Sequence, residues 1–125
     1  MTQPLHEVSM TVAQQQIDIY AELTNDFNPI HVDPAFAATT PMGGVIAHGT
    51  LSINLIWQSV AKSLGAAAIE KALLDIQFLK PLYAGDTVTA GGQRNAECAN
   101  QFDVWVKSAD GSTLIAGNIS LPDQS

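Results

Sequence analysis

The spacing of hydrophobic positions changes partway along the chain, from a helical period to an alternating one. Residues 8–12 are short and extended in character and predict a first strand. Over residues 13–24 apolar side chains recur every three or four positions, which predicts an amphipathic helix. We expect Thr11 to cap this helix and Gln14 to reach back to it, as in a capping box.

The most apolar helix is predicted over residues 50–64. Its hydrophobic side chains cover most of its circumference, which is typical of a buried helix; they are Leu51, Ile53, Leu55, Ile56, Trp57, Val60, Ala61 and Leu64. Gly65 follows in the usual position of a C-terminal cap. This helix is the only predicted element large enough to cover a sheet.

Beyond the long helix, alternating apolar positions predict four strands, near residues 74–78, 87–98, 102–106 and 113–121. Gly91 and Gly92 indicate a bulge or bend within the second of them. Asp110 and Gly111 form a strong hairpin signal between the last two. We therefore expect an α+β fold, with an antiparallel sheet wrapped around a long central helix in one domain spanning residues 1–125.

Composition narrows the choice of partners. Hydrophobic residues make up 46% of the chain and charged residues 14%, and the net charge is −7. This balance argues against nucleic acid and anionic membranes, which call for basic clusters. A small anionic ligand needs only a few local cations, for which Lys62, Lys80 and Arg94 are candidates. No apolar run approaches the roughly 20 residues of a membrane span.

Two further features bear on the compartment. The first residues, from Met1 to Pro4, lack the basic start and apolar core of a signal peptide. Cys98 is the only cysteine, so no disulfide can form within the chain. We expect a cytoplasmic protein, with Cys98 inert.

The side chains best suited to catalysis are concentrated in residues 24–34. Asp26 and His31 are five positions apart, and Pro29 between them opposes a continuing helix, so we expect both on a shaped loop. Asp33, followed by a proline, predicts the start of another short helix near residues 35–38. An acid and an imidazole held in this way are suited to position a water molecule and to move its proton.

These residues belong to a pattern that resembles a known family, the MaoC-like (R)-specific enoyl-CoA hydratases. The segments that carry the resemblance are Asp26-Phe27-Asn28-Pro29-Ile30-His31-Val32-Asp33-Pro34, Ala47-His48-Gly49 and Lys80-Pro81-Leu82-Tyr83-Ala84-Gly85-Asp86. The family has the hot-dog fold, in which a curved antiparallel sheet wraps a central helix. The resemblance implies an acyl-CoA thioester substrate, no cofactor besides the CoA of the substrate itself, no metal, and a homodimer or higher homo-oligomer.

The resemblance also implies roles for individual residues. Asp26 and His31 correspond to the catalytic dyad, although the sequence does not settle which is base and which is acid. Gly49 corresponds to the glycine that opens the central helix, where a backbone N–H can stabilise the negative charge on the thioester oxygen. We expect further contacts with the substrate from Asn28, His48, Trp57 and Lys80.

One position departs from the family pattern. Some members carry a serine nine residues after the histidine that corresponds to His48, and this chain has Trp57 there. An indole at this point would reshape the acyl pocket or belong to the core. Ser52 and Asn54 lie on the same helix but do not align with that serine.

The sequence leaves other interpretations open. A hot-dog thioesterase would attack the carbonyl, but such enzymes generally place a carboxylate on or beside the central helix, and residues 50–64 contain none. A non-catalytic acyl-CoA-binding subunit would be expected to have lost Asp26 or His31. Asp26 could also cap a turn while His31 is half-buried, and a metal site at His31, Asp33 and His48 has weak spacing.

Overall fold

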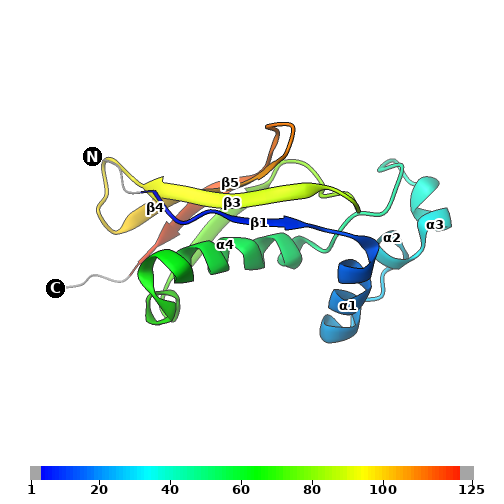
Figure 1. The fold of residues 1–125 in the computed structure, drawn as a ribbon, viewed down its shortest axis with the longest axis horizontal. Coiled ribbons are helices and arrows are strands. Elements are labelled where there is room, and N and C mark those ends of the chain that lie inside the picture. Colours follow the sequence, from blue (N-terminus) through cyan, green and yellow to red (C-terminus); the bar gives the residue numbers. More distant parts are fainter. Residues whose placement is uncertain (1–3, 122–125) are drawn as a thin grey trace.

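A five-stranded antiparallel sheet and one long helix packed along it dominate the structure (Figure 1). The computed structural model describes residues 4–121. The strands are β1 (Val8–Thr11), β2 (Leu73–Phe78), β3 (Thr87–Arg94), β4 (Gln101–Ser108) and β5 (Thr113–Ser120). The helices are α1 (Gln14–Thr24), α2 (Pro29–Val32), α3 (Pro34–Ala38), α4 (Gly49–Leu64) and the 3₁₀-helix η1 (Ala66–Ile69).

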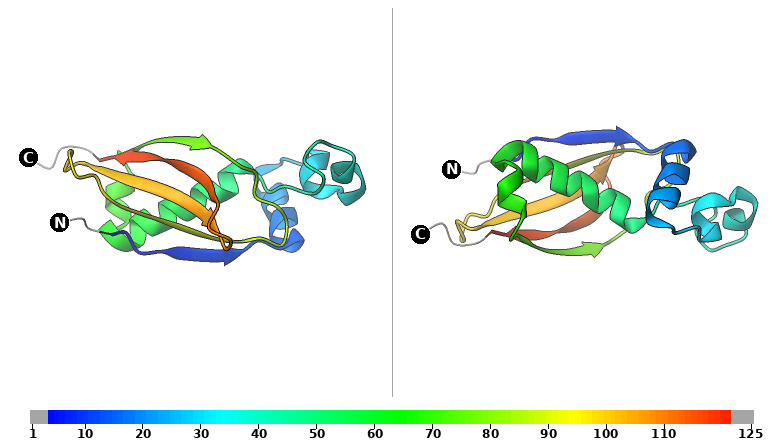
Figure 2. Two further views of the ribbon diagram at one scale, coloured as in Figure 1. Left: turned by 90° about the horizontal axis from the view of Figure 1, so that it is seen from above. Right: turned by 90° about the horizontal axis from the view of Figure 1, so that it is seen from below.

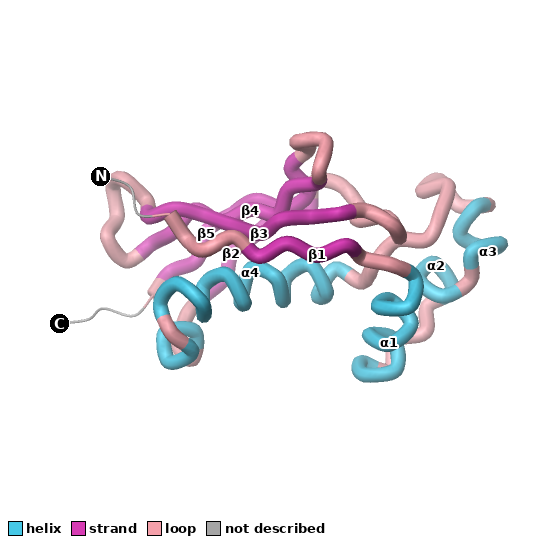
Figure 3. Tube along the Cα trace, in the orientation of Figure 1, coloured by secondary structure: helices cyan, strands magenta, loops and turns pink. Residues whose placement is uncertain are grey.

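The strand order is β1-β3-β4-β5-β2, with every neighbouring pair antiparallel. The strands β3, β4 and β5 follow one another as a meander, whereas β2 lies at the far edge beside β5. The helices lie on one side of the sheet, and α1, α2 and α3 gather beyond one end of it (Figures 2 and 3). The predicted sheet around a central helix is therefore confirmed.

The core lies between α4 and the sheet. Ile56 and Val60 of α4 are fully buried, as are Phe102 and Val106 of β4. Because each fully buried aliphatic or aromatic side chain of this size stabilises a fold by about 1.5–3 kcal/mol, this layer holds α4 firmly against the strands. The helix begins at Gly49, one residue before the predicted start, and Gly65 ends it with a φ of 89°.

The predicted capping of the first helix was wrong. The helix α1 is not capped by Thr11 and Gln14: the Gln16 side chain accepts a hydrogen bond from the Ala13 N–H instead. The Thr11 hydroxyl forms a 2.8 Å hydrogen bond with the hydroxyl of Thr87 on the neighbouring strand. The capping residues are therefore displaced by two positions, because β1 extends through Thr11 and removes it from the helix start.

The expectations for the third strand also needed correction. No register shift occurs at Gly91 and Gly92, which pair regularly with β4, and the irregularity lies between Val106 and Lys107. Gly92 serves close packing instead, since a Cβ there would lie 2.3 Å from a backbone oxygen of the neighbouring strand. The strand ends at Arg94, not at residue 98.

Residues 1–3, which carry most of the segment assessed for a signal peptide, lie outside the described residues. Within residues 4–121, no helix has the length and apolar character required to cross a membrane.

Candidate active site

Asp26 is held just beyond the end of α1. Asn25 adopts the left-handed conformation with a φ of 55°, and the Asp26 N–H donates to the carbonyl of Ala21 at 3.0 Å. Such a left-handed cap turns the chain sharply out of the helix. The Asp26 carboxylate then accepts a bond from the Asn28 N–H at 3.3 Å and is otherwise exposed.

His31 lies on the one-turn helix α2, which corrects the expectation of a loop. The helix α1 already ends at Thr24, and Pro29 occupies the first helical position of α2, where its missing N–H costs nothing. Asn28 caps this turn by accepting from the Ile30 N–H at 3.2 Å. Gln14 of α1 donates to the carbonyl of His31 at 2.9 Å and ties the two helices together.

The hydrogen bonds of His31 determine which ring nitrogen is free. Its Nδ1 lies 2.7 Å from the backbone oxygen of Ile46. Because a carbonyl can only accept, Nδ1 carries the hydrogen and the lone pair is left on Nε2. His31 is half-buried, so this lone pair is available to take a proton from a water molecule.

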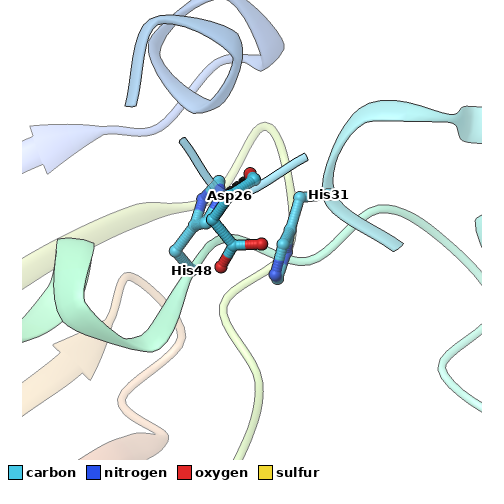
Figure 4. Close-up of side chains that lie close together, drawn as sticks. All are labelled: Asp26, His31 and His48. Carbon is cyan, nitrogen blue, oxygen red and sulfur yellow. Dashed lines mark hydrogen bonds between the residues drawn. The ribbon is translucent and has the colours of Figure 1, made fainter. Parts of the chain in front are cut away.

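His48 supports both members of the pair. It is 3% exposed, and its Nε2 donates to the backbone oxygen of Asp26 at 3.0 Å. Its ring stacks on that of His31 with centroids 4.0 Å apart, and the Tyr20 ring meets it in a T-shaped arrangement with centroids 5.1 Å apart. Figure 4 shows the Asp26 carboxylate pointing into the space beside the two rings. His48 therefore connects the loop of Asp26 to the imidazole of His31.

No direct hydrogen bond or ion pair joins the carboxylate of Asp26 to His31 in the described part of the chain. One potential ligand atom from each of Asp26, His31 and His48 lies within 4.8 Å of the others. A gap of this kind accommodates a bridging water, which bonds to each side at about 2.8 Å. The same three residues are also close enough to hold a metal ion, and no fourth histidine, cysteine, aspartate or glutamate of the described residues joins the group.

The start of α4 faces the same region. Gly49 is the first residue of this helix, and its N–H has no acceptor among residues 4–121. A free N–H at the positive end of a helix dipole attracts negative charge. The ring of Phe78 lies against the glycine, since a Cβ there would be 3.0 Å from its Cζ. Gly49 is thus both a donor and the reason that Phe78 can approach.

A cavity of about 390 Å³ is lined by His31 and Gly49, whereas Asp26 and His48 are not among its lining residues. His31, Gly49 and Ser52 line one side of it, and the remaining lining residues are mostly apolar: Met42, Ile46, Ala47, Phe78, Leu79, Lys80, Pro81, Leu82, Leu114 and Ile115. Apolar walls with a few convergent polar groups are typical of a site for an acyl chain. The side chains of Lys80, Pro81 and Leu114 also border a neighbouring cavity of about 530 Å³.

The residues predicted to contact the substrate differ in whether they line the cavity. Lys80 borders both cavities, and His48 lies behind the pair formed by Asp26 and His31. Asn28 is exposed and caps α2, and it does not line the cavity. Trp57 lies two turns along α4, partly buried against the core, and does not line it either.

Two residues outside the predicted set contribute to the site. The Tyr20 hydroxyl donates to Thr50 at 2.6 Å and so fixes α1 to the start of α4. Ser52 is 4% exposed and faces the cavity. The helical spacing of Ser52 from Gly49 was a usable signal, because residues three apart share a helix face.

Asp110 lies in the turn between β4 and β5, beside the larger cavity. Hydrogen bonds from the Ser108 hydroxyl and the Ser112 N–H lower the pKa of Asp110 to about 2. These donors favour the charged carboxylate even though it is fully exposed.

Comparison with known proteins agrees with the family resemblance found in the sequence. The model of the MaoC like domain matches residues 1–113. The (R)-specific enoyl-CoA hydratase of Aeromonas caviae is 37% identical over 75 residues, which cover 60% of this chain and 56% of that protein. The 3-hydroxybutyryl-CoA dehydratase of Methylorubrum extorquens is 42% identical over 72 residues, covering 55% and 44%. The chain spans about half the length of the curated relatives it matches.

Solved structures extend the similarity over nearly all of the chain. An unliganded R-hydratase from Pseudomonas aeruginosa superposes with a TM-score of 0.80 at 25% identity, covering 99% of this chain and 83% of that one. An (R)-hydratase from A. caviae involved in PHA biosynthesis gives a TM-score of 0.79 at 27% identity, covering 96% and 95%.

Proposed function

Because this chain belongs to the MaoC-like domain family, we propose that it is an (R)-specific enoyl-CoA hydratase. It adds water reversibly across the double bond of a trans-2-enoyl-CoA and yields a (3R)-3-hydroxyacyl-CoA. The observation that carries the proposal is that His31, with its free Nε2, and Gly49, with its free N–H, line one apolar cavity. The similarity to a hydratase and a dehydratase of this reaction class supports it.

Each group has a task in the proposed reaction. A water molecule between Asp26 and His31 attacks the β-carbon as one of the pair removes its proton, and a proton is delivered to the α-carbon. Negative charge then develops on the thioester oxygen, which the Gly49 N–H stabilises. Preorganised donors of this kind typically contribute about two to three decades in rate.

The remaining predicted contacts act around this centre. Lys80 is positioned to meet a polar or anionic part of the CoA where the two cavities adjoin. His48 fixes the Asp26 loop through its bond to the backbone. Asn28 shapes α2 and Trp57 packs beside the core, so we propose that both act on the substrate indirectly. No metal or separate cofactor is needed for these steps.

The test is incubation of the purified protein with crotonyl-CoA. The expected product is (3R)-hydroxybutyryl-CoA, identified by chiral analysis together with loss of the enoyl absorbance. Asp26→Asn and His31→Ala should each lower kcat by at least about a hundredfold, because each removes a group from proton transfer. Glu22→Gln on α1 and His6→Ala are matched controls that neutralise or remove the same kind of group away from the cavity.

The outcomes separate the competing functions. Full activity in either variant would overturn the assignment of Asp26 and His31 as a catalytic dyad. Release of free CoA without hydration would indicate a thioesterase, although α4 carries no acidic side chain for such chemistry. Binding of the thioester without turnover would indicate an acyl-CoA-binding subunit.

A further inference from the structure

The three serines of α4 differ in how their hydroxyls are used. Ser59 donates to the backbone oxygen of His6, and Ser63 donates to the carbonyl of Ser59 at 2.8 Å. Ser52 is 4% exposed and lines the cavity, and among residues 4–121 its hydroxyl makes no hydrogen bond of the kind that holds Ser59 and Ser63. Among the described residues the only fully buried side-chain nitrogen or oxygen without a partner is His48 Nδ1, so the Ser52 hydroxyl is open to the cavity and can bond to a molecule held there. Such a group calls for an explanation from function.

The position of Ser52 directs its hydroxyl toward the reaction centre. Side chains on a helix lean toward its N-terminus, and residues three apart are neighbours on one face. Ser52 therefore lies above the turn that begins at Gly49, which has no side chain of its own and against which the Phe78 ring packs. Both residues line the same cavity as His31.

We propose that the Ser52 hydroxyl is a second hydrogen-bond donor, beside the Gly49 N–H, to the thioester oxygen of the bound substrate; this inference rests on the hydratase function proposed above. The hydroxyl keeps its proton throughout and donates a stronger hydrogen bond as negative charge develops on that oxygen. It stabilises the enolate-like transition state more than the uncharged substrate. Its loss therefore lowers kcat more than it raises KM.

The first experiment compares Ser52→Ala with Ser63→Ala in steady-state hydration of crotonyl-CoA. Ser52→Ala should lower kcat by about a hundredfold, the effect typical of removing one donor to an oxyanion. Ser63→Ala, which removes a hydroxyl on the same helix away from the cavity, should retain the wild-type kcat. An unchanged kcat in Ser52→Ala, whether or not KM changes, would overturn the proposal and leave Ser52 as part of the pocket wall.

A second experiment is independent of turnover. Acetoacetyl-CoA forms an enolate whose near-ultraviolet absorbance rises when a protein stabilises the charged oxygen. The wild type and Ser63→Ala should bind this enolate with equal affinity, and Ser52→Ala should bind it at least about tenfold more weakly. If the wild type proves not to hydrate enoyl-CoA, a Ser52-dependent enolate signal would still support the donor. Equal binding by Ser52→Ala, or no binding by the wild type, would overturn it.

Discussion

At the scale of single residues, the site depends on backbone oxygens as much as on the acid and the imidazole. The Ile46 carbonyl fixes the tautomer of His31, and the Asp26 carbonyl fixes that of His48. Each oxygen can only accept, so each ring has one defined lone pair. The family pattern in the sequence names Asp26 and His31 but contains no information on these tautomers, because the partner of His31 lies 15 residues away in the chain.

Gly49 offers a test of packing at the same scale. A methyl group at this position would meet the Phe78 ring at 3.0 Å, and this ring is the end of a half-exposed side chain that can move. Gly49→Ala keeps the N–H, and alanine favours helices, so the protein should fold. The displaced ring and the added methyl group should misplace the thioester and lower kcat/KM by about tenfold or more.

The double variant Gly49→Ala/Phe78→Leu separates the two causes. Leucine is smaller than phenylalanine, so Gly49→Ala should cost less kcat/KM in the Phe78→Leu background than in the wild type. A smaller loss supports steric displacement of the ring. An equal loss in the two backgrounds, measured as a double-mutant cycle, would mean that the methyl group itself blocks the substrate.

At the scale of elements, the pattern of the sequence predicted most of what the structure contains. The period of α4 and the alternation in β4 were readable because one side of each is buried, and in β2 the alternate residues Leu74 and Ile76 are at least half-buried. The end of β3 was not readable, since it depends on Asn95, whose side chain accepts from the Glu97 and Cys98 N–H groups and turns the chain. The turn α2 was missed because four residues are too few to show a period.

The β4–β5 hairpin gives a prediction about pH. The pKa of Asp110 in the folded protein is lowered to about 2, chiefly by the hydrogen bond from Ser108. A lowered pKa means that the carboxylate contributes stability above the unfolded value near 4, and that this contribution is lost as the pH falls through about 2. Asp110→Asn should therefore have a lower melting temperature than the wild type at pH 6.

The difference between the two melting temperatures should shrink as the pH falls from about 4 to about 2. Thermal unfolding followed by circular dichroism over this range measures it. Because Asp110 is exposed, the effect should be small and should weaken only slightly in salt, since hydrogen bonds and not distant charges cause it. A constant difference at all pH values would mean that the amide disturbs the turn in some other way.

At the scale of the whole molecule, β2 forms an open edge of the sheet. One side of β2 pairs with β5, and the other side has no neighbouring strand among residues 4–121. Leu73, Phe78 and Leu79 at this edge are 74%, 56% and 52% exposed. An exposed apolar edge strand is a template for pairing with a second chain. We therefore predict a homodimer joined along β2, with twice the chain mass of 13.2 kDa.

Leu73→Lys should shift the protein toward the monomer in light scattering coupled to gel filtration, because a charge on an edge strand opposes pairing. Leu23→Lys on α1 is the matched control, since Leu23 is 78% exposed but lies away from the sheet. The same edge reaches the active site, because the Phe78 ring lies against Gly49. Pairing along β2 would hold this ring in place, so specific activity should fall on dilution of the wild type and be low in Leu73→Lys. A dimeric Leu73→Lys beside a monomeric Leu23→Lys would move the interface to the helical end of the molecule.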